Sequence, residues 1–139
     1  MRDLKILTTK MESEWIALLD RIPEDLRDIH FHPSYMSIYE QVYDIKALLF
    51  VFTANNNTII QPLMIRNIPD HLQFKDATSV YGYGGPILLD SSLPDSYGEL
   101  ISDYSFSLKE WFDQKIFVGS VLNYLFYELS LEPQKFFRY

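Results

Sequence analysis

The chain has 139 residues, the size of one ordinary domain, and we expect a single domain over residues 1–139. Hydrophobic residues make up 47% and aromatic residues 16%, a composition that excludes intrinsic disorder. The 12 basic and 19 acidic residues give a formal net charge of −7, which disfavours general binding to the phosphate backbone of nucleic acids.

The first expected elements are a short strand and an amphipathic helix. Residues 4–7 form the strand candidate. Thr9 and Glu12 follow at the spacing of a capping box, in which each side chain satisfies a free backbone N–H at a helix start. The apolar face of the helix consists of Trp15, Leu18, Leu19 and Ile22. Pro23 cannot donate to the preceding turn, so we expect the helix to end there.

A second helix and a β-hairpin are expected next. The helix follows segment 30–34, in which Pro33 stands near the first helical position. Its aromatic-rich face consists of Tyr35, Ile38, Tyr39 and Val42. Residues 46–54 and 58–66 are rich in Ile, Val, Phe and Leu, and the three asparagines between them tolerate the positive φ of a hairpin turn. Pro62 lacks an N–H and belongs at a sheet edge or a bulge.

A polar stretch after the turn at 69–70 leads to the motif Tyr-Gly-Tyr-Gly-Gly-Pro at 81–86, which is followed by a strand candidate at 87–89. A long third helix is expected after it, because Ser96 and Glu99 stand at capping-box spacing. Its apolar stripe consists of Tyr97, Leu100, Ile101, Tyr104, Leu108, Trp111 and Phe112.

The last part of the chain, from about residue 116 to residue 139, is atypical. It contains strand candidates at 116–118 and 121–127 and ends on bulky aromatic side chains, without the polar residues usual at a terminus. A truncated gene, a frameshifted ending and a boundary inside a longer chain fit this pattern equally well.

The sequence also carries expectations about the compartment. The chain has no cysteine, which excludes disulfides and thiolate metal sites. Its first residues lack the apolar run of a secretory signal, and apolar stretches such as 47–52 are far shorter than the roughly 20 residues that span a bilayer. We therefore expect a cytoplasmic protein that does not bind or cross a membrane.

The Tyr-Gly motif is the strongest candidate for a binding loop. Clustered glycines let the backbone take positive φ and approach a ligand, while tyrosines offer stacking faces and hydroxyls. The alternative is a tight connection whose glycines satisfy only geometry, and both interpretations stay open. The motif is no P-loop, because no Lys-Ser or Lys-Thr follows at the required spacing, and it lacks the G-x-G-x-x-G pattern.

Other catalytic signatures find no support in the sequence. His30 and His32 lie two residues apart with His71 distant, so we expect no metal site and read the first two as flanking a helix start. No G-x-S-x-G elbow occurs, which argues against a hydrolase of that class. Acidic residues are scattered, and no carboxylate pair can be singled out for acid/base catalysis.

Four segments of the chain are informative together: Glu14-Trp15 with Leu18, residues 32–35, the hairpin sequence at 60–66 and the Tyr-Gly motif. In this combination the chain resembles a bacterial family, the Fem-like branch of the GNAT superfamily. This branch includes peptidoglycan bridge-forming aminoacyltransferases, and the similarity runs from about residue 10 to residue 112.

The resemblance implies a fold and an activity. The fold would be α+β (or α/β), with a GNAT-like mixed, largely antiparallel sheet flanked by helices, as an incomplete half of a two-lobed fold. The activity would be transfer of an acyl or aminoacyl group, from acyl-CoA or aminoacyl-tRNA, to an amine on a small-molecule or cell-wall-precursor acceptor. Complete relatives carry a second half that holds the donor's phosphates, so this chain is expected to need that half or a partner.

The resemblance also implies which residues approach the acceptor. The candidates are Tyr81, Gly82, Tyr83, Gly84 and Gly85 of the loop, Tyr35 for aromatic contact and Arg66 for an anionic group. Ordinary structural roles remain open for all of them, as packing side chains, tight-turn glycines or a solvated strand end. No catalytic residue, cofactor or metal is assigned.

Two other functions remain open. The chain could be a non-catalytic binding or interaction module that uses the Tyr-Gly loop or a sheet edge, or it could be a truncated remnant of such an enzyme. A homodimer is one way in which an exposed sheet edge would be covered.

Overall fold

The computed structural model describes residues 2–79, 85–89, 95 and 97–114, with only the backbone for 71–73. Its elements follow one another as β1 (Arg2–Thr8), α1 (Glu12–Leu19), the 3-10 turns η1 (Glu24–Leu26) and η2 (Ile29–Phe31), α2 (Pro33–Val42), β2 (Ile45–Ala54), β3 (Asn57–Ile68), β4 (His71–Thr78), β5 (Ile87–Leu88) and α3 (Tyr97–Gln114). The strand candidates at 116–118 and 121–127 lie outside the described residues.

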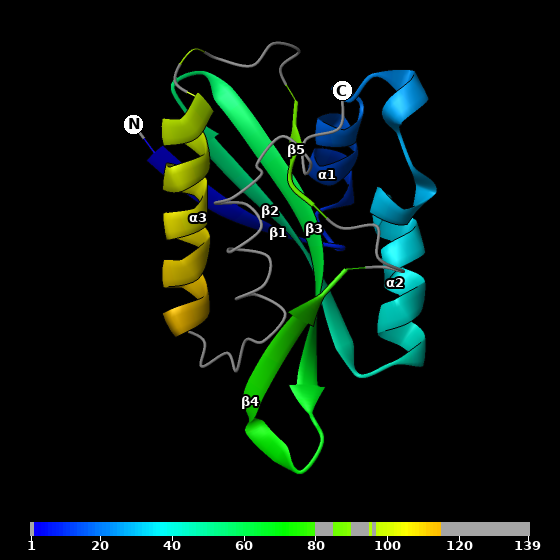
Figure 1. Cartoon of the computed structure of the whole chain (residues 1–139). Helices are drawn as coiled ribbons and strands as arrows, with labels where there is room; N and C mark the ends of the chain where they lie inside the picture. The colour runs from blue at the N-terminus through cyan, green and yellow to red at the C-terminus, as the bar shows by residue number, and fades with distance from the viewer. Residues whose placement is uncertain (1, 80–84, 90–94, 96, 115–139) are drawn as a thin grey trace.

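The described strands form one antiparallel sheet. The strand order is β1-β2-β3-β4, and β5 pairs with β3 on the same side as β4. Figure 1 shows α3 on one face of the sheet and α1 with α2 on the other. The expected α+β class, an antiparallel sheet flanked by helices, is confirmed.

Alternating side chains of the central strands supply the two cores. In β2, Phe50 and Phe52 point toward α3, whereas Leu49 and Val51 point toward α1 and α2. Each face of the sheet thus buries its own apolar cluster, because successive residues of a strand point to opposite sides. The predicted stripe of α3 is confirmed, since five of its seven side chains belong to the buried cluster on that face and the other two, Tyr97 and Trp111, pack against it.

The hairpin between β2 and β3 is confirmed, with a two-residue turn. Ala54 pairs with Asn57, and Asn55 and Asn56 between them have φ of 50° and 64°. Positive φ at both central residues is the geometry of a type I′ turn, which matches the right-handed twist of the strands.

The predicted start of the first helix is wrong. α1 begins at Glu12 after Met11, without a side-chain cap, and Thr9 donates instead to Oε1 of Glu40 at 2.5 Å. The second oxygen of Glu40 accepts from the backbone N–H of Ala47 at 3.1 Å. Through Glu40 of α2, Thr9 directly after β1 is thus connected to the backbone of β2, and its hydroxyl does not cap α1. α1 also ends at Leu19, before Pro23.

α2 begins as predicted, with Pro33 in its first turn. His32 caps it, because its Nδ1 accepts from the backbone N–H of Ser34 at 3.2 Å. Trp15 of α1 is fully buried, and its Nε1 donates to the backbone oxygen of Phe31 at 2.9 Å. This bond fixes the segment just before α2 against α1.

The sequence did not predict β4. The stretch 71–78 was interpreted as a polar connection, but it pairs with β3 from Met64↔Thr78 to Ile68↔His71. Asp70 has φ of 65°, which allows a tight turn after Pro69. The resulting β3–β4 hairpin extends past the ends of α2 and α3 in Figure 1.

Among the described residues, no helix is both long and apolar enough to cross a membrane.

Candidate functional site

The described pairing along the β4/β5 side of β3 has a gap that coincides with the Tyr-Gly motif in the sequence. β3 pairs with β4 up to Met64, opposite Thr78, and with β5 from Ile60, opposite Ile87. Residues 79–86 connect β4 to β5, and this connection has more residues than the segment 61–63 of β3 that lies between the two pairings. Its first residue, Ser79, and its last two, Gly85 and Pro86, are described, whereas Tyr81, Gly82, Tyr83 and Gly84 lie outside the described residues.

Pro62 of β3 lies in this gap. The backbone oxygen of Thr58 accepts from the N–H of Leu89 at 2.9 Å, so that residue points its backbone groups toward β5. Since backbone groups alternate along a strand, Pro62 points its missing N–H to the same side, between the residues of β3 that pair with β4 and those that pair with β5. No described residue pairs with Pro62 on that side, so its place at an edge or a bulge stays a prediction.

A groove opens on the α2 face of the β3–β4 hairpin. We call it the α2–β4 groove, and its volume is about 840 Å³, within the usual range of small-molecule sites. It is lined by Tyr39, Tyr43, Asp44, Ile45, Met64, Arg66, Asn67, Ile68, Pro69, Asp76, Thr78 and Ser79. The connection that carries the Tyr-Gly motif therefore leaves β4 from the wall of the groove.

One wall of the groove belongs to a row of tyrosines along α2 that ends at Tyr43, the residue after the helix. The ring centroids of Tyr35 and Tyr39 lie 5.6 Å apart, and those of Tyr39 and Tyr43 lie 5.8 Å apart. Four-residue spacing brings the three rings to one side of the helix. The rings of Tyr35 and His30 also pack in a T-shaped arrangement, with centroids 4.9 Å apart. The predicted residue Tyr35 therefore begins the row, and the next two tyrosines line the groove.

The opposite wall carries an ion pair between adjacent strands. Nε and Nη2 of Arg66 donate to the two carboxylate oxygens of Asp76 at 2.7 and 2.6 Å. These hydrogen bonds are the main cause that raises the pKa of the Arg66 guanidinium above its ordinary value. Arg66 was predicted to meet an anionic group, and the structure gives it an internal carboxylate that occupies two of its five N–H donors.

The groove is suited to binding an amine beside an aromatic surface. Its charged side chains are Asp44, Arg66 and Asp76, which leaves a net negative charge. Negative charge near tyrosine faces favours a cationic or amine-bearing ligand, through both hydrogen bonds and cation–π contact. In the part of the chain that is described, no cluster of three or more His, Cys, Asp or Glu is placed to hold a metal ion.

Sequence reasoning missed several residues of this groove. Tyr39 was noticed only as part of an aromatic stripe, and Tyr43, one further turn along, continues the same spacing. Asp76 and Thr78 could not be found because their position depends on pairing with Arg66 and Met64.

Comparison with known proteins found no family model, curated protein or solved structure that matches the chain. The function is therefore inferred from the geometry of the groove and from the motif resemblance.

Proposed function

We propose that the α2–β4 groove binds the amine-bearing acceptor of an acyl- or aminoacyl-group transfer, and that this chain supplies the acceptor side of such an enzyme. The observation that carries the proposal is the position of the tyrosine row opposite Asp76, at the place where the Tyr-Gly connection leaves β4. The acyl-CoA or aminoacyl-tRNA donor is taken from the resemblance to Fem-like transferases, as is the requirement for a second half or a partner.

The chemistry of the groove supports this acceptor class. An ammonium group would be held by the acceptor positions that remain on Asp44, one oxygen of which accepts from Asn67, and on Asp76, both oxygens of which accept from Arg66, since a carboxylate offers about four acceptor positions. The remaining N–H donors of Arg66 would suit a carboxylate or carbonyl on the same acceptor. A small-molecule or cell-wall-precursor acceptor that carries a lysine-type amine has both kinds of group.

We expect the conversion of either groove carboxylate to an amide to weaken acceptor binding. Asp44→Asn and Asp76→Asn each remove one negative charge with almost no change in shape, and each should lower the affinity for a lysine-containing muropeptide about tenfold. Isothermal titration of the purified chain measures this loss.

The matched control is Asp25→Asn, which makes the same charge change at an exposed residue of η1 outside the groove. It should bind as the unmodified chain does. Equal affinity in Asp76→Asn and Asp25→Asn, with both proteins folded by circular dichroism, would exclude the groove as the acceptor site.

A non-catalytic interaction module is the second candidate. It is favoured by large apolar side chains exposed on α2 and at its C-terminal cap, namely Ile38 at 55%, Val42 at 65% and Tyr43 at 60%. Exposed apolar side chains that gather on one helix are typical of surfaces that bind other proteins. Acyl transfer in the presence of donor and acceptor would favour the enzyme, whereas stable capture of one partner without turnover would favour the module.

A further inference from the structure

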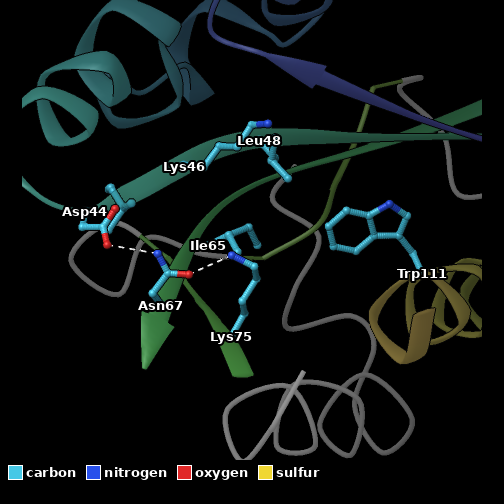
Figure 2. Close-up of a pocket in the computed structure, with 8 residues that line it drawn as sticks. Asp44, Lys46, Leu48, Ile65, Asn67, Lys75 and Trp111 are labelled. Atoms are coloured by element: carbon cyan, nitrogen blue, oxygen red, sulfur yellow. Dashed lines mark hydrogen bonds between the residues drawn. The ribbon is translucent and has the colours of Figure 1, made fainter. Parts of the chain in front are cut away.

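A second cavity lies on the opposite face of the same hairpin. We call it the α3-side cavity, and its volume is about 350 Å³. Figure 2 shows Lys75 of β4 and the indole of Trp111 of α3 on opposite sides of this cavity. The two cavities share Asp44, Ile45 and Asn67 as lining residues, so this part of the chain forms the wall between them.

The polar side of the α3-side cavity is positively charged. Lys46 and Lys75 line it together with one carboxylate, that of Asp44. Nδ2 of Asn67 donates to Asp44 at 3.0 Å, and Nζ of Lys75 donates to Oδ1 of Asn67 at 2.8 Å. Lys75 is thus oriented by a neutral amide, and its ammonium keeps two further N–H donors. A net positive cavity in a chain of net charge −7 favours an anionic ligand.

The other side of the cavity is apolar and held in place. Leu48 and Ile65 are buried residues of β2 and β3 that line it. The Trp111 ring meets Phe50 edge-on, with centroids 4.9 Å apart, and meets Phe112 at 5.2 Å. An indole fixed by two aromatic neighbours presents a preorganised surface to a flat ligand, because little conformational freedom is lost on binding.

We propose that the α3-side cavity binds a small aromatic carboxylate. Its ring would lie against Trp111, Leu48 and Ile65, and its carboxylate would accept hydrogen bonds from Lys75 and Lys46. The size of the cavity fits a ligand of one or two rings, near the lower end of small-molecule sites. This cavity shares Asp44, Ile45 and Asn67 with the acceptor groove but lies on the other face of the hairpin, and its net charge has the opposite sign.

The test is a titration of the full chain with 2-naphthoate. Calorimetry measures the binding, and the indole N–H signals in a 15N–1H correlation spectrum report which tryptophan is affected. The chain has two tryptophans, and Trp15 is buried on the other face of the sheet. Binding should be saturable, should shift the signal of Trp111 and should leave that of Trp15 in place. A Trp111→Phe variant assigns the two signals.

Charge variants give the second readout. Lys75→Gln and Lys46→Gln should each weaken naphthoate binding about tenfold, whereas Lys10→Gln, an exposed residue outside the cavity, should not change it. The neutral analogue 2-naphthylmethanol should bind more weakly than naphthoate.

Several results would overturn the proposal. They are the absence of saturable binding to the folded chain, equal binding of the neutral analogue, equal loss in Lys10→Gln, and a shift confined to Trp15. None of them depends on the acceptor groove, since Asp76→Asn should leave naphthoate binding unchanged.

Discussion

Replacement of Trp15 by alanine is expected to lower the free energy of unfolding by about 3–5 kcal/mol, the largest effect of any substitution considered for this chain. The indole is fully buried between α1 and the sheet and is among the largest fully buried side chains of the described residues. Its removal leaves a cavity and also leaves the backbone oxygen of Phe31 without the Nε1 donor. Urea unfolding followed by circular dichroism measures the loss.

Trp15→Phe separates the two contributions to this effect. Phenylalanine fills most of the space but cannot donate a hydrogen bond, so it should cost less than alanine, about 1–3 kcal/mol. Equal stability of Trp15→Ala and the unmodified chain would contradict the packing described for α1. Because Phe31 lies two residues before the start of α2, the same substitution should also disturb the tyrosine row.

The second large effect is expected at the buried hydrogen bond that connects α3 to the centre of the sheet. The Tyr104 hydroxyl donates to Oε1 of Gln61, and both residues are almost completely buried. Burial raises the pKa of the Tyr104 hydroxyl far above its ordinary value, so it remains a donor throughout the neutral range. Tyr104→Phe leaves the Gln61 oxygen unpaired and should lower the free energy of unfolding by about 1–3 kcal/mol.

A double-mutant cycle checks this assignment. Gln61→Leu alone should also destabilise the chain, since it leaves the Tyr104 hydroxyl without its acceptor. The double variant, which removes both polar groups, should lose less than the sum of the two single losses. Strict additivity in urea unfolding would show that the two side chains do not interact.

Much of the fold follows from local sequence patterns. The hairpin of β2 and β3 and the apolar stripe of α3 are encoded by asparagine turn chemistry and by helical spacing, which operate over a few residues. β4 was missed because its sequence is polar, and its strand conformation depends on pairing with β3. The capping role predicted for Thr9 was wrong for a related reason, since its hydroxyl donates a hydrogen bond to Glu40, which lies 31 residues away in the sequence.

The candidate groove was predictable only in part. Tyr35 and Arg66 were chosen from the motif resemblance. Arg66 lines the groove, whereas Tyr35 reaches it only through its neighbours in the row, Tyr39 and Tyr43, which line it. The role of Asp76 could not be predicted, because an Arg–Asp pair ten residues apart requires knowledge of the strand register. The α3-side cavity depends likewise on long-range contacts that bring β2, β3, β4 and α3 together.

The most direct test of the central claim compares two muropeptides that differ only at the lysine side chain, one with a free ε-amine and one with that amine acetylated. If the α2–β4 groove recognises an acceptor amine, isothermal titration of the unmodified chain should show saturable binding of the free amine and at least about tenfold weaker binding of the acetylated form. Equal affinity for the two, or no binding of either to the folded chain, would contradict an acceptor site in this groove.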